Sequence, residues 1–206
     1  CHGKCAFCIT GFVYPLWVNS DVKLLRAMEI AKARYCQITY ITNDSESLHI
    51  PGAAQSMRVR SYLAQVNPVT NKMMHFGIEG FTEELRKTFA KPISDVDITK
   101  LLELLVHRKQ QAELFFIGGF PNDHADAFGF VETVIPHCLK MYPKIFFKIT
   151  NFEPGPQTPY WNYDVESIEY WTAGDAVKLF HKINVINKTI RVFPVEYPVK
   201  ALRRTM

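Results

Sequence analysis

The sequence predicts an α/β domain built on a parallel β-sheet, and two observations support this. Short β-branched and aromatic runs alternate with amphipathic helical patterns, which is typical of successive strand–helix–strand units. Polar or glycine-rich breaks follow these runs, as expected where strands end in turns. The chain has 206 residues, 48% of them hydrophobic and 13% aromatic, which suits one globular core. Such a sheet is either open or closed as a barrel.

Expected elements in the first half begin with a helix over Asp21–Arg34, for which Ser20 is the N-cap. A β-branched strand over 37–42 follows, and it ends in a turn at Asn43 and Asp44. We expect further strands over 57–63 and 75–78, the latter stopping at the sequence Glu79–Gly80.

Helix signals are strongest in the middle of the chain. Thr82 is placed to cap a helix that runs to about Phe89. Ser94 and Asp97 resemble a capping box for a helix that ends near Arg108. The remaining expected elements are a strand over 113–117, a helix from residue 123, a strand over 144–150, a helix over 165–181 and a strand over 188–193.

The breaks after these strands matter because the carboxyl ends of parallel strands meet at one edge of a sheet, where ligands bind. Asn43–Asp44, Glu79–Gly80, Gly118–Gly119 and the loop from Asn151 all follow expected strands. We therefore expect them to line one rim.

Composition narrows the class of protein. The formal net charge is only +4, and apart from Lys200, Arg203 and Arg204 the basic residues are scattered, so no nucleic-acid footprint is expected. No run of about 20 apolar residues is present to span a membrane. Three of the five cysteines lie in the first eight residues. This clustering favours a metal site in a reducing compartment, the cytoplasm, over a disulfide framework.

The first eight residues read Cys1-His2-Gly3-Lys4-Cys5-Ala6-Phe7-Cys8, a C-x3-C-x2-C spacing. Three thiolates on such a loop can bind three irons of a four-iron cluster and leave the fourth iron open for a ligand. Phe7 can shield the cluster or stack on a bound base. The alternative is a zinc knuckle with His2 or a remote residue as the fourth ligand. Cys36 and Cys138 are expected to pack as small apolar residues.

This motif resembles the cluster-binding loop of the radical S-adenosylmethionine (SAM) superfamily. Four further segments are similar to segments of that family, in order and at suitable distances. The pattern is closest to the branch of cobalamin-dependent radical SAM methyltransferases and methylthiotransferases. The four segments are ITND (41–44), HFGIEG (75–80), FIGGFPND (116–123) and NFEPGPQTP (151–159).

The resemblance implies a partial (β/α)6 TIM-like barrel of parallel strands. Its first strand is missing, since the family places a strand before the cysteine loop and this sequence starts at Cys1. Residues 1–160 would form the radical SAM core and residues 161–206 an α-rich C-terminal extension packed on it. Cobalamin, if used, would be bound by a domain outside this chain.

By the same resemblance, Cys1, Cys5 and Cys8 would ligate a [4Fe-4S] cluster. An electron from it would cleave SAM to methionine and a 5′-deoxyadenosyl radical, which abstracts hydrogen from an unknown substrate. Methyl or methylthio transfer is the expected reaction, with a flavodoxin- or ferredoxin-type protein as reductant. The alternative is a non-enzymatic iron–sulfur or zinc module. The expected SAM-binding residues are Phe7, Asn43, Asp44, Arg60, Glu79, Gly118 and Gly119.

Two pairs of residues each have two alternative interpretations. Arg58 and Arg60 would share one face of the strand expected over 57–63, where one of them could pair with the methionine carboxylate or form a surface ion pair. Tyr160 and Trp161 either line the substrate opening or pack with other aromatic residues.

Overall fold

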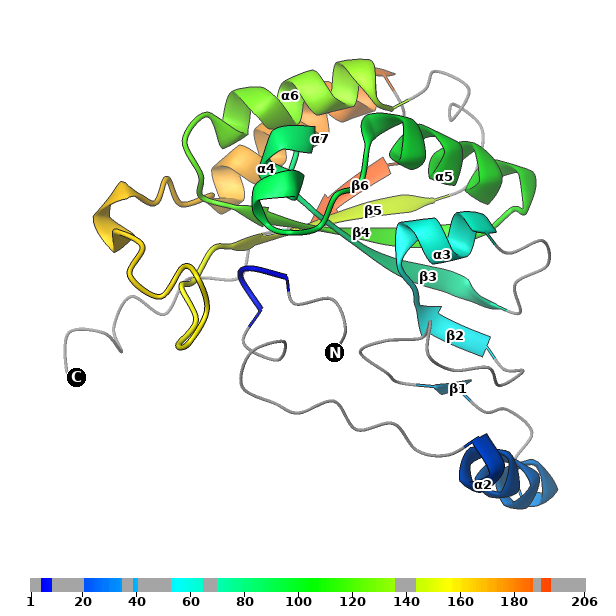
Figure 1. The fold of residues 1–206 in the computed structure, drawn as a ribbon. Helices are drawn as coiled ribbons and strands as arrows, with labels where there is room; N and C mark the ends of the chain where they lie inside the picture. Colours follow the sequence, from blue (N-terminus) through cyan, green and yellow to red (C-terminus); the bar gives the residue numbers. More distant parts are fainter. Residues whose placement is uncertain are drawn as a thin grey trace.

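The structure is a computed structural model that describes residues 5–8, 21–34, 39–40, 53–64, 70–135, 144–186 and 190–193. Its centre is a six-stranded sheet in which every pair of neighbouring strands is parallel (Figure 1). The strands follow one another in chain order: β1 (Thr39–Tyr40), β2 (Ala53–Ser56), β3 (Thr70–Glu79), β4 (Gln111–Gly118), β5 (Ile145–Asn151) and β6 (Ile190–Phe193).

The helices that connect the strands cover one face of this sheet. Figure 1 shows α3, α4, α5, α6 and α7 together on that face, whereas α2 lies beside the β1 edge. This arrangement follows when successive strand–helix–strand units keep one hand and the strand order never reverses. The helices are α2 (Asp21–Arg34), α3 (Val59–Ala64), α4 (Glu83–Thr88), α5 (Asp95–His107), α6 (Asp123–Thr133) and α7 (Ala173–Ile186).

The core lies between the sheet and these helices. Alternate residues of β3, β4 and β5 are buried on this side, as the period of two in a strand requires, and α5 adds an apolar stripe. The strands expected around 75–78, 113–117, 144–150 and 188–193, and the capped helices at 83 and 95, are therefore confirmed. The buried set includes Met74, Phe76, Ile78, Leu114, Phe116, Phe147, Ile149, Ile98, Leu101, Leu102 and Leu105.

The strand expected over 57–63 is wrong, because this segment contains the helix α3. Val59 and Tyr62 are its buried residues, and their spacing of three is helical rather than alternating. Arg60 lies on the exposed side, where its Nε is 3.5 Å from Asp97 Oδ2 and 64% of its side chain is accessible. Of the two readings for Arg60, a surface ion pair is the one that the structure contains.

Residues 161–206 were expected to form an α-rich extension, but their described part continues the sheet. The helix expected over 165–181 is instead a short 3-10 turn at Val165–Ser167 followed by α7. The strand β6 then pairs with β5 in parallel, with Ile190 opposite Ile145. This segment thus supplies one more helix–strand unit of the same kind.

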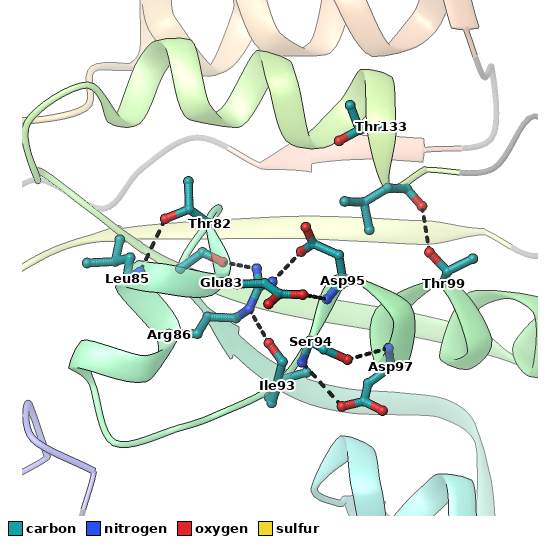
Figure 2. A network of polar contacts seen from close by, with 12 residues as sticks. Thr82, Glu83, Leu85, Arg86, Ile93, Ser94, Asp95, Asp97, Thr99 and Thr133 are labelled. Carbon is teal, nitrogen blue, oxygen red and sulfur yellow. Dashed lines mark hydrogen bonds and ion pairs between the residues drawn. The ribbon is translucent and has the colours of Figure 1, made fainter.

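A buried arginine holds the connection between α4 and α5 (Figure 2). Arg86 donates from Nε to the Ile93 carbonyl at 2.7 Å and from Nη1 to the Gly80 carbonyl at 2.9 Å. Its Nη2 pairs with the Asp95 carboxylate. The caps predicted from the sequence are present at both helix starts: Thr82 accepts from Leu85, and the Ser94 capping box opens α5. These contacts fix the segment 89–94, which reaches the candidate site described below.

Among the described residues, none of the helices combines the length and apolar character that crossing a membrane requires.

Replacing Arg86 with methionine is expected to lower the free energy of unfolding by about 3 to 5 kcal/mol, because buried carbonyls and a carboxylate lose their donor. The matched control is Arg60→Met, since that ion pair is solvent-exposed and should contribute less than about 1 kcal/mol. Chemical denaturation measures both variants. Equal losses in the two would contradict the role given to Arg86.

Candidate functional site

Cys5 and Cys8 lie on one turn that docks on the segment 89–94. The Cys8 amide donates to the Cys5 carbonyl at 2.9 Å, which closes the turn. The Ala6 amide donates to the Phe89 carbonyl at 2.9 Å, and the Phe7 ring meets the Phe89 ring edge-on, with centroids 5.2 Å apart. In Figure 1 this blue segment lies on the side of the sheet opposite helices α4 to α7. One hydrogen bond, from Ala6 to Phe89, and one aromatic contact therefore dock the cysteine turn on this segment.

Burial and nearby charged side chains both affect the Cys5 thiol. Burial is the main cause that raises the pKa of the Cys5 thiol above its ordinary value. The charge of Lys91 opposes this increase, and that of Glu79 adds to it. Cys5 thus lies within electrostatic range of both side chains. A raised pKa favours the protonated form of the thiol.

Glu79 and Lys91 form a close ion pair on the sheet at the end of β3. Lys91 Nζ donates to Glu79 Oε1 at 2.6 Å, and both side chains are largely buried. A Cβ at Gly77 would lie 2.1 Å from that Glu79 oxygen and 2.5 Å from Lys91 Nζ. The missing side chain at Gly77 therefore makes the space that this pair occupies.

Glu79 also has an unusual backbone. Its φ angle is 74°, in the left-handed region, and the register with β4 shifts between Gly77 and Glu79. A left-handed conformation is unfavourable for a residue other than glycine, and such strain clusters at functional sites. Its position at a strand end, as predicted, and this strain together make Glu79 the strongest candidate in the site.

The turn after β4 is organised by a buried carboxylate. Asp123 Oδ2 accepts from the Gly119 amide at 2.6 Å and from the Phe120 amide at 2.8 Å. Gly119 has a φ angle of 114°, which favours glycine. Burial raises the pKa of Asp123 to about 7, although the two backbone hydrogen bonds act in the opposite direction.

Gly118 and Gly119 permit close contacts, but the contacts are made by this chain itself. A Cβ at Gly118 would lie 2.4 Å from Trp171 Cδ1, and one at Gly119 would lie 2.7 Å from Ile168 Cγ2. The Asn151 side chain makes two hydrogen bonds to the backbone of Trp171. Asn151 Nδ2 donates to the Trp171 carbonyl at 3.0 Å, and Asn151 Oδ1 accepts from the Trp171 amide at 2.7 Å.

An aromatic cluster lies next to the cysteine turn. Its rings meet mostly edge to face, as at Phe89 and Phe120, whose centroids are 5.1 Å apart. Tyr160 belongs to it, and burial raises the pKa of the Tyr160 hydroxyl. Trp161, the neighbouring residue, is exposed. The aromatic cluster consists of Phe7, Phe89, Phe120, Phe152, Tyr160 and Tyr163.

The structure thus brings together Cys5, Cys8, Phe7 and Glu79, but places Arg60 in a surface pair on α3. Cys1, Asn43 and Asp44 lie outside the described residues. Within the described part of the chain, no group of three or more His, Cys, Asp or Glu side chains is arranged to hold a metal ion. Cys5 and Cys8 are two of the three thiols that the sequence predicts for the cluster.

Sequence reasoning missed Lys91 and Trp171. Lys91 sits between a helix end and Pro92, without a motif, and its partner Glu79 is 12 positions away. Trp171 lies in the segment that was expected to be outside the core. Their roles come from contacts between distant segments, which no local pattern indicates.

No protein-family model matches this chain, and no curated protein matches it significantly. The resemblance to the radical SAM superfamily therefore stays a prediction that rests on the cysteine motif and the four sequence segments.

Asp123→Asn should change how stability depends on pH. The folded-state pKa of Asp123 is about 7, and that of an unfolded aspartate is about 3.9. At pH values between these two pKa values, the folded chain therefore keeps a proton that the unfolded chain has lost. The contribution of Asp123 to the free energy of unfolding is full below about pH 4 and decreases as the pH rises to about 7. Between pH 5 and pH 7 the wild type should lose about 2 kcal/mol more than the variant.

The asparagine variant is a close control, since its amide oxygen can still accept from Gly119 and Phe120. Urea denaturation at several pH values measures the difference. Parallel pH profiles for the two proteins would show that Asp123 has no raised pKa.

Proposed function

We propose that this chain is the core of a radical SAM enzyme, in which Cys5 and Cys8 help to hold an iron–sulfur cluster. The observation that carries this proposal is the position of the cysteine turn. The turn docks on the segment 89–94 and lies in electrostatic range of the Glu79–Lys91 pair, at the carboxyl end of a strand in a parallel sheet. Ligands of parallel α/β folds bind at that edge.

The strand order supports the barrel part of the proposal. A sheet whose strands follow chain order, with all crossover helices on one face, has the winding of a (β/α) barrel. A doubly wound sheet would instead reverse its order and carry helices on both faces. We therefore assign the described sheet to an open part of a (β/α)6 barrel, with the cysteine turn on its inner side.

The donor set fits an iron–sulfur cluster. Cys5 and Cys8 are unpaired thiols, both partly exposed, on one tight turn. With Cys1 they would supply three thiolates, the ligand count that leaves one iron open. When bound, such a cluster supplies the electron that cleaves the carbon–sulfur bond of SAM. The Phe7 and Phe89 rings meet edge-on beside the turn and would place apolar surface next to the cluster.

The other residues have roles in binding SAM. The Glu79 carboxylate would accept hydrogen bonds from the two ribose hydroxyls, while Lys91 holds it in place against Gly77. Because Trp171 and Ile168 already contact Gly118 and Gly119, we assign the apolar contact with adenine to the aromatic cluster. The resemblance to methyl- and methylthiotransferases suggests the group that is transferred, and the reductant would be a small flavin or iron–sulfur protein.

Anaerobic reconstitution with iron and sulfide tests the proposal. The chain should bind about four irons and, with dithionite and SAM, release 5′-deoxyadenosine. The variants Cys5→Ala and Cys8→Ala should lose both properties. The variant Cys138→Ala should keep them, because Cys138 is expected to be a packing residue. Stoichiometric zinc without iron, or a full cluster that never cleaves SAM, would overturn the enzyme proposal.

Glu79→Gln should weaken SAM binding to the reconstituted protein by at least about tenfold, because a charge-assisted acceptor is lost. Iron content should stay unchanged, which separates loss of the ligand site from loss of the cluster. Glu84→Gln is the matched control, since Glu84 is exposed on α4. Equal SAM affinity in both variants, measured by equilibrium dialysis, would remove Glu79 from the site.

A further inference from the structure

The sheet face opposite the helices, here called the open face, carries a row of charged side chains across its central strands. His75 on β3 stands opposite Glu113 on β4 in the strand register. Glu113 Oε2 lies 3.4 Å from His75 Nε2 and 3.0 Å from Lys148 Nζ on β5. These three partly buried side chains are called the open-face triad below.

One oxygen of the Glu113 carboxylate therefore lies close to two basic groups, those of His75 and Lys148. The open-face triad joins one acidic and two basic side chains in a partly desolvated place, where Coulomb interactions are stronger than in water. The Phe115 ring lies beside both basic groups: its centroid is 5.8 Å from that of His75 and 5.4 Å from Lys148 Nζ. Cationic donors next to an aromatic surface suit an anion that is attached to an apolar body.

Such a row is unusual for a parallel sheet. Parallel strands are normally covered on both faces, and their residues are nearly all apolar. The helix side of this sheet follows that rule, with Phe76, Leu114 and Phe147 fully buried. On the open face, the described strand residues include His75, Glu113 and Lys148, whose side chains are 25%, 15% and 38% accessible. Partly burying charged groups costs desolvation energy that well-packed apolar residues would avoid, so the triad is better explained by a ligand than by stability.

The open-face triad also lies in line with the proposed SAM site. His75, Gly77 and Glu79 alternate along β3, and the Glu79 carboxylate lies over Gly77 on this same face. His75 precedes Glu79 by four residues, which corresponds to about 13 Å along a strand. A substrate anchored at the triad would therefore extend toward the carboxyl edge, where the cysteine turn lies.

We infer that the open-face triad binds an anionic group of the substrate, a carboxylate or a phosphate, while Phe115 packs on the adjoining apolar part. That this anion belongs to a substrate rests on the proposed function, whereas anion binding at the triad does not. Lys148 and His75 supply the donors, and the Glu113 carboxylate pairs with both of them when no anion is bound.

The experiment titrates succinate and inorganic phosphate, separately, into the whole chain before and after iron–sulfur reconstitution. Nuclear magnetic resonance signals of the His75 imidazole report binding at the triad. We expect saturable shifts with at least one probe, and the tighter probe identifies the kind of anion. Lys148→Gln should weaken that binding at least about tenfold, the effect of one charge-assisted hydrogen bond, and Lys148→Arg should retain it.

Lys182→Gln is the matched control. Lys182 has the same side-chain exposure as Lys148, 38%, and also combines an ion pair with a ring contact, but it lies on α7 against Glu132 and Phe128. Its replacement should leave anion affinity unchanged. Glu113→Gln removes the carboxylate that competes with the anion, so the variant should bind the anion at least as tightly as the wild type. A triad with only a structural role would show no such anion binding.

The outcomes separate the two proposals. Absence of saturable shifts with both probes, or equal affinities for Lys148→Gln and Lys182→Gln, would overturn the triad proposal even if SAM is cleaved. Should Lys148→Gln fail to fold, weaker binding by Glu113→Gln would overturn it instead. Anion binding in a chain that never cleaves SAM would refute the proposed function and leave the triad as an anion site.

Discussion

The missing side chain at Gly77 is the constraint on which the candidate site depends. Because no Cβ fills that space, the Glu79–Lys91 ion pair can lie against Gly77, within electrostatic range of Cys5. Lys91 reaches it only because the segment 89–94 is held in place, and Arg86 holds that segment from inside the core. A core arginine, a glycine in a strand and a cysteine turn thus form one connected unit.

The two faces of the sheet carry different kinds of residues. On the helix side, alternate strand residues form a continuous apolar core, which supplies the free energy that keeps the site rigid. On the open face, the same strands carry polar and charged residues, from the open-face triad to Glu79. This division places the charged side chains on strands, which hold their positions more precisely than loops do.

Local signals in the sequence predicted most of the fold between residues 70 and 135. The caps at Thr82 and Ser94 depend on neighbouring residues only, so their patterns were sufficient. The helix α3 was mistaken for a strand because its six residues are too few to show a clear period. Within the site, the strand ends predicted Glu79 and the turn at Gly118, but not Lys91 or Trp171, whose contacts join segments distant in sequence.

X-ray diffraction at the iron absorption edge, from crystals reconstituted without oxygen, would locate the proposed cluster. We expect an anomalous peak bounded by the sulfur atoms of Cys5 and Cys8, on the open face and next to the Glu79 carboxylate. An iron peak elsewhere, or an anomalous signal only at the zinc edge at these sulfur atoms, would contradict this expectation.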